Sequence, residues 1–168
     1  QISVVILAAA AIHSVCLAPD EDARAEVYML YDDMGYVPRW VFTLGFYRES
    51  LTAVGRWGEG SSTVAPLSQS TFNQALSNGR LVYVSSHGAK GYIMISGRFY
   101  RPQDVIRDNI GKKLQYVYLA GCDTGFLSAD WEEALRPAQV KTFDRLSTMA
   151  EHIYWLVFDG PGIIDALK

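Results

Sequence analysis

The chain has few of the residues that build disulfide frameworks or metal centres. Its 168 residues include two cysteines, Cys16 and Cys122, and three histidines. Two cysteines are too few for a disulfide framework, and their separation does not fit a zinc ligand pair. His13 and Cys16 have no further Cys or His nearby to complete a zinc site. We therefore expect neither a metal site nor a bound cofactor, and free thiols are compatible with a reducing compartment.

The sequence also lacks an excess of positive charge. Fifteen Lys and Arg stand against 18 Asp and Glu, for a net charge of −3. This balance provides no basic footprint, so nucleic acid is not expected as the main partner. A hydrophobic fraction of 49% and a charged fraction of 20% are ordinary for a globular protein. No repeat or linker divides the chain, which predicts one domain over residues 1–168.

The first 18 residues carry no formal charge apart from a contribution of His13. They are apolar enough to suggest the core of a secretion signal or a short membrane span. A basic region in front of the apolar run is missing, and we interpret Ile2 to Leu7 as a buried first strand instead. This interpretation favours a cytoplasmic protein without a membrane span, with secretion as the alternative.

The rest of the chain alternates between strand and helix patterns. Acidic residues after Pro19 favour a helix opening there, and we expect this helix to continue through Leu30 and to stop near Gly35. The elements expected next are a strand (or helix) over 39–47, a Gly/Ser-rich loop over 55–62, a helix over 70–76, a strand from 81, a hairpin over 92–100, a helix over 102–111, a strand from 114, a helix over 130–137, a strand over 139–143 and a closing helix (or strand) over 147–160. This alternation predicts a three-layer α/β/α sandwich with a mostly parallel central sheet.

Two apolar runs end in a reactive side chain beside glycine. The run from Leu81 to Ser85 precedes His87 and Gly88, and the run from Leu114 to Ala120 precedes Cys122. Such runs are typical of buried strands in a parallel sheet. Reactive groups of open α/β sheets gather just beyond the carboxyl ends of the strands. A histidine and a cysteine at one edge can form a base and a nucleophile, so the sequence predicts a cysteine hydrolase.

The predicted chemistry assigns a role to each of three residues. A thiol is mostly protonated at neutral pH, so Cys122 needs a base, and His87 is expected at the same sheet edge. Acyl transfer also needs donors that face the developing oxyanion. The backbone N–H groups of Gly88 and Cys122 are the candidates for this oxyanion hole. Glycine at position 88 also lets the main chain approach a substrate closely.

These segments resemble the caspase-like cysteine peptidases, the superfamily of caspases, gingipains, legumain, separase and CHAT domains. The family pattern is an apolar strand ending in His-Gly, then an apolar strand ending in a small residue and Cys, with Gly soon after. Ser86-His87-Gly88 and the stretch from Ala120 to Gly125 match this pattern. The similarity is to bacterial CHAT-type domains in particular and covers Ser70 to Phe126. It implies a caspase-like fold, an endopeptidase with a His87–Cys122 dyad, a peptide or protein substrate and a regulatory protein partner.

Substrate specificity is left open by these motifs. The acid that some lysine- or arginine-specific relatives carry before the cysteine is replaced by Ala120. Asp123 and Asp159 are the candidate carboxylates for substrate binding. Two alternative functions also stay open. One is a cysteine amidase or acyl-transfer enzyme that uses Cys122 with His152, and the other is a non-catalytic caspase-like module that binds a partner.

Overall fold

The structure is a computed structural model, and it describes residues 27–32, 62–148, 151, 154 and 158. The strands expected over 2–7 and 39–47 lie outside the described residues, as do His13, Cys16, His152 and Asp159. In the closing segment, Glu151 and Tyr154 are helical, in agreement with the expected helix.

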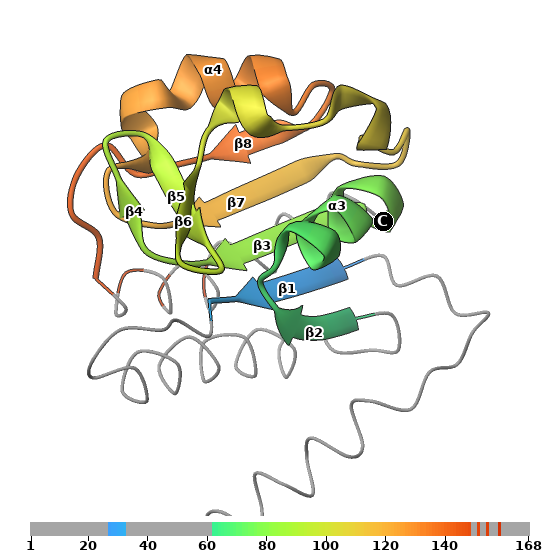
Figure 1. Ribbon diagram of the computed structural model, residues 1–168, viewed down its shortest axis with the longest axis horizontal. Helices are drawn as coiled ribbons and strands as arrows, with labels where there is room; N and C mark the ends of the chain where they lie inside the picture. The colour runs from blue at the N-terminus through green and yellow to red at the C-terminus, as the bar shows by residue number, and fades with distance from the viewer. Residues whose placement is uncertain (1–26, 33–61, 149–150, 152–153, 155–157, 159–168) are drawn as a thin grey trace, which may run out of the picture.

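A five-stranded sheet forms the centre of the fold (Figure 1). Its strands, in the spatial order β2-β1-β3-β7-β8, are β2 (Ser62–Pro66), β1 (Val27–Tyr31), β3 (Leu81–Ser85), β7 (Tyr116–Ala120) and β8 (Gln139–Lys141). All four ladders between them are parallel. The last residues of the three inner strands, Tyr31, Ser85 and Ala120, pair in one row. The carboxyl ends of these strands therefore meet at one edge of the sheet.

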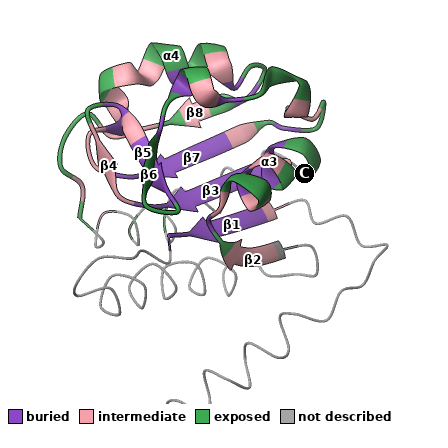
Figure 2. Ribbon diagram, viewed as in Figure 1, coloured by how far each residue is buried: buried purple, intermediate pink, exposed green. Residues whose placement is uncertain are grey.

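Both faces of the three inner strands are buried (Figure 2). One face packs against helices α3 (Gln69–Asn78) and α4 (Ser128–Ala134) through a cluster that includes Leu30, Val82, Val84, Val117, Leu119, Phe72 and Trp131. On the other face Tyr83 stacks on Tyr118, with ring centroids 5.2 Å apart. Apolar residues at successive positions explain why these strands are inner strands of a parallel sheet. The described residues thus form an α/β fold with a mostly parallel sheet, while a second helical layer stays a prediction.

Helix α3 confirms the expected helix over 70–76. Ser68 caps its first turn, since the Ser68 hydroxyl accepts from the Thr71 amide and the Thr71 hydroxyl accepts from the Ser68 amide. The Gly79 amide donates to the Ala75 carbonyl at the other end. Helix α4 and strand β8 likewise confirm the expected helix over 130–137 and strand over 139–143.

A small antiparallel sheet follows His87 along the chain. It contains β4 (Gly88–Ala89), β5 (Tyr92–Ile95) and β6 (Arg98–Tyr100), and it confirms the hairpin expected over 92–100. Both of its two-residue turns have positive φ at both positions, with 51° and 88° at Lys90-Gly91 and 50° and 76° at Ser96-Gly97. This conformation suits the right-handed twist of hairpin strands and favours glycine at the second position.

Two expectations are wrong, and one strand was missed. Residues 27–31, which belong to the helix expected to run through Leu30, form strand β1 instead, because this apolar run is buried between two parallel neighbours and the packing outweighs the acidic helix signal before it. Strand β2 was not expected at all. Residues 102–111 form two short 3₁₀ turns, η1 (Pro102–Asp104) and η2 (Arg107–Asn109), rather than one helix. In a continuous helix the Asp104 carbonyl would accept from a backbone amide, whereas here it accepts from the Tyr100 hydroxyl at 2.6 Å.

Candidate active site

The candidate dyad follows two neighbouring strands. Strands β3 and β7 are adjacent in the sheet, and Ser85 pairs with Ala120 at the end of their ladder. The ladder continues one step further, since the Ser86 amide donates to the Ala120 carbonyl at 3.1 Å. His87 and Cys122 come two residues after their strands. Both residues therefore leave the sheet from neighbouring points on its carboxyl edge.

Two glycines allow these chain segments to touch. A Cβ atom at Gly88 would lie 2.3 Å from the Cys122 carbonyl oxygen and 3.0 Å from the Cys122 nitrogen. A Cβ atom at Gly121 would lie 3.1 Å from the Ser86 oxygen. The main chains of Gly88 and Cys122 are thus in direct contact, and no larger residue fits at position 88 without a shift. The glycine after the histidine serves the packing of the two strand ends, a role that sequence reasoning did not assign to it.

His87 is half-buried at this edge, and its main chain is fixed by the neighbouring hairpin. Its carbonyl accepts from the Met94 amide at 2.8 Å and lies 2.9 Å from the Ser86 hydroxyl. Desolvation by burial lowers the pKa of the His87 imidazole below its ordinary value. The neutral ring is therefore favoured at neutral pH, and this is the form that can accept a proton.

Cys122 is also half-buried, and its thiol contacts the segment that follows β8. The sulfur lies 3.4 Å from the Ser147 carbonyl, to which the thiol donates, and 3.8 Å from the Ser147 hydroxyl. Asp123 has a left-handed conformation, with φ of 55°, and turns the chain into the 3₁₀ segment η3 (Thr124–Leu127). This sharp turn leaves the cysteine at the end of the strand rather than inside a helix.

Asp123 is the predicted substrate carboxylate that the structure describes. It is next to Cys122 and half-buried. Its main chain is fully engaged, because its amide donates to the Arg145 carbonyl at 2.9 Å and its carbonyl accepts from the Gly91 amide at 2.7 Å. The structure thus puts this residue within the loop of the candidate nucleophile.

Asp32 is a residue at this edge that sequence reasoning missed. It directly follows β1 and is fully buried, and its amide donates to the Ser85 carbonyl at 2.9 Å. The strand order reverses between β1 and β3, because β2 lies on one side of β1 and the later strands lie on the other. Open α/β sheets form ligand crevices at such points. The signal in the sequence is an apolar run that ends in a polar residue, as it is before His87 and Cys122, although the acidic residues upstream of this run predict a helix.

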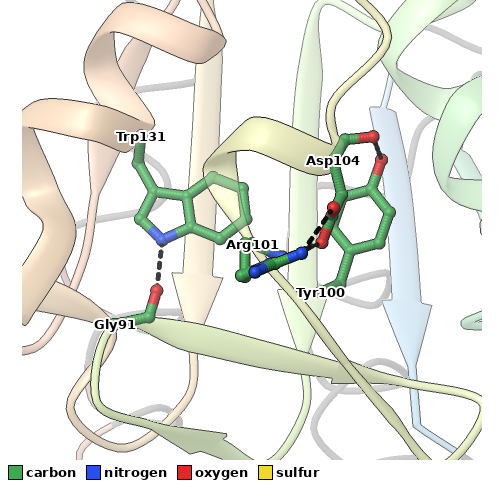
Figure 3. A network of polar contacts seen from close by, with 5 residues as sticks. All are labelled: Gly91, Tyr100, Arg101, Asp104 and Trp131. Carbon is green, nitrogen blue, oxygen red and sulfur yellow. Dashed lines mark hydrogen bonds and ion pairs between the residues drawn. The ribbon is translucent and has the colours of Figure 1, made fainter.

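Gly91, in the first turn of the small sheet after His87, is held by Trp131 of α4 (Figure 3). Its indole nitrogen donates to the Gly91 carbonyl at 2.7 Å, and the Gly91 amide in turn donates to the Asp123 carbonyl. A Cβ atom at Gly91 would lie 2.3 Å from the Leu127 Cγ atom, so this turn packs directly on η3. The two segments that carry the candidate dyad are therefore joined at a second point beyond the sheet.

No three His, Cys, Asp or Glu side chains within the described ranges are grouped so that they would hold a metal ion. Likewise, none of the helices that the structure describes is long and apolar enough to cross a membrane. No family model, no curated protein sequence and no solved structure matches this chain.

Proposed function

We propose that this chain is a cysteine endopeptidase of the caspase-like type, with Cys122 as nucleophile and His87 as base. The proposal includes a three-layer α/β/α sandwich as the complete fold and a peptide or protein as the substrate. The observation that carries it is the pairing of β3 with β7. Two adjacent parallel strands in register are followed by His87 and Cys122 at the same edge, with the main chains of Gly88 and Cys122 in contact.

The proposed reaction uses groups of these two segments. Neutral His87 takes the thiol proton while the Cys122 sulfur attacks the carbonyl carbon of the scissile peptide bond. The oxyanion accepts hydrogen bonds from the amides of Gly88 and Cys122. His87 then gives its proton to the departing amine, which leaves a thioester on the sulfur. Water, deprotonated by His87, attacks the thioester and releases the acid, so the thiol is restored.

Two carboxylates are candidates for recognition of a positively charged substrate group. Asp123 follows the nucleophile directly and is half-buried, and Asp159 is the second candidate from the sequence. A carboxylate near the sulfur would favour lysine or arginine beside the cleaved bond.

The test is hydrolysis of a fluorogenic peptide library by the purified chain and four variants. We expect Cys122→Ala to abolish turnover and His87→Ala to lower kcat by about 10²–10⁴-fold. Cys16→Ala is the matched control for loss of a thiol, and we expect it to leave kcat unchanged. Full activity of Cys122→Ala would overturn the proposal.

The same assay separates the alternatives. An amidase or acyl-transfer enzyme with a Cys122–His152 pair would lose activity in His152→Ala and keep it in His87→Ala. A non-catalytic module would give no turnover for the wild type at any concentration. It would also bind its partner equally well after Cys122 and His87 are both replaced by alanine.

A further inference from the structure

Residues 143–148, which we call the strap, run antiparallel to the loop that carries Cys122. The Gly125 amide donates to the Phe143 carbonyl at 2.5 Å, and the Asp123 amide donates to the Arg145 carbonyl at 2.9 Å. Residue numbers rise along the strap as they fall along the loop. The strap therefore lies on the loop as an extended peptide would, and it occupies two amide donors of the loop that carries Cys122.

The contact between strap and loop is tight. The Phe143 amide donates to the buried Thr124 hydroxyl at 3.0 Å. A Cβ atom at Gly125 would lie 2.7 Å from the Asp144 nitrogen and 2.8 Å from the Phe143 carbonyl carbon. The lack of a side chain at Gly125 is thus what lets the two main chains meet.

The strap ends on the sulfur. The Ser147 carbonyl oxygen is 3.4 Å from the Cys122 sulfur and accepts the thiol hydrogen. This hydrogen bond exists only while the sulfur carries its proton, and a carbonyl oxygen is not a base that can remove it. The carbonyl also stands at about the distance at which reacting atoms of a bound substrate would be held. The strap therefore lies against the thiol, and Cys122 is half-buried.

The outer side of the strap is held by exposed groups. Asp144, Arg145 and Leu146 are exposed, the last of them at 74%. Arg145 forms an ion pair with Glu151 at 2.7 Å, and the Arg145 side chain is 66% exposed. An exposed ion pair of this kind contributes little to the stability of a fold.

We propose that the strap is a removable cover of the Cys122 thiol, and that its release is the step that admits a peptide substrate. The contact of Ser147 with the sulfur is the observation behind this proposal, and the regulatory consequence rests on the proposed endopeptidase function. Release uncovers the sulfur and frees the amides of Asp123 and Gly125, which can then bind the main chain of an extended peptide.

The test measures how fast iodoacetamide alkylates Cys122 in the folded full chain, with the Cys122 peptide quantified by mass spectrometry. Arg145→Ala removes the ion pair of the strap, and we expect alkylation to become about two- to fivefold faster. Gly125→Ala introduces a Cβ atom against the strap, and we expect an increase of about tenfold or more. Arg136→Ala breaks a comparable exposed ion pair with Glu133 on α4, and it should leave the rate unchanged.

Because Gly125→Ala changes the packing, a denaturant titration must show that it is folded at the assay temperature, and Arg145→Ala tests the proposal independently. Unchanged alkylation in both strap variants would overturn the cover. Faster alkylation without peptide hydrolysis by any variant would support the cover and contradict the endopeptidase. Hydrolysis by the wild type with equal alkylation in all variants would support the endopeptidase and eliminate the cover.

Discussion

Replacing Trp131 with phenylalanine should destabilise the fold through one buried hydrogen bond. Trp131 is fully buried, and its indole nitrogen donates to the carbonyl of buried Gly91 at 2.7 Å (Figure 3). Phenylalanine keeps an aromatic ring but has no donor, so the carbonyl loses its partner at a cost of about 1–3 kcal/mol. The smaller ring also leaves a void, which adds about 1 kcal/mol. We expect the free energy of unfolding to fall by about 2–4 kcal/mol.

Urea unfolding followed by far-UV circular dichroism measures this change. Fluorescence is unsuitable, because the variant loses one of four tryptophans. The melting temperature should drop by about 5–15 °C for a domain of this size. Tyr100→Phe is the matched control, since it removes a hydroxyl that donates to the Asp104 carbonyl at 2.6 Å while keeping the ring. We expect this control to lose about 0.5–1.5 kcal/mol. A loss below about 0.5 kcal/mol in Trp131→Phe, at an unchanged m-value, would refute the role given to the indole.

Three further predictions concern titration and packing. Burial lowers the pKa of His87, so below about pH 6.5 the unfolded chain takes up a proton that the folded histidine does not. The free energy of unfolding, measured by urea titration, should therefore fall as the pH falls, and it should fall less in His87→Gln. Burial, reinforced by the charge of Asp104, raises the pKa of Tyr100 to about 12. The free energy of unfolding should therefore fall as the pH rises from about 10 to 12, because the unfolded tyrosine loses its proton first. Tyr100→Phe should reduce this pH dependence in the same assay. Gly88→Ala forces a Cβ atom against the Cys122 carbonyl and should lower the melting temperature by about 2–10 °C. Gly97→Ala is the comparison for backbone strain alone, because a Cβ atom there meets no neighbour but the residue has positive φ.

The central strands could be predicted from the sequence where their signal is local. The apolar runs of β3 and β7 end abruptly in polar residues and glycine, and both runs are inner strands. The run in β1 has the same character, but an acidic stretch before it resembles a helix start and misled the assignment. Its burial between β2 and β3 decides its conformation, and such pairing over long sequence distances is not visible in a local pattern.

The candidate site also has features that the sequence reveals and features that it does not. His87 and Cys122 could be found because each ends a predicted strand, whereas Asp32 was missed together with its strand. The contact of Gly88 with Cys122 depends on the register of two strands, and the contact of Ser147 with Cys122 depends on a segment 25 residues further along the chain. Sequence patterns identify the residue types at a sheet edge, but such contacts require the tertiary structure.

The register of the ladders limits how far apart the chemistry-bearing residues are. Tyr31, Ser85 and Ala120 share one row, so Asp32 begins the next row on β1, and His87 and Cys122 follow one step later on β3 and β7. Neighbouring strands are about 4.8 Å apart, so the three chain segments leave the sheet within about 10 Å of one another. A fully buried carboxyl beside a half-buried imidazole and thiol costs folding free energy even when each group has partners. Folds concentrate such costs at reactive sites, whereas a surface that only binds a partner does not require them. Asp32 is therefore a further candidate residue at this edge, and Asp32→Asn should lower peptide turnover if the edge is an active site.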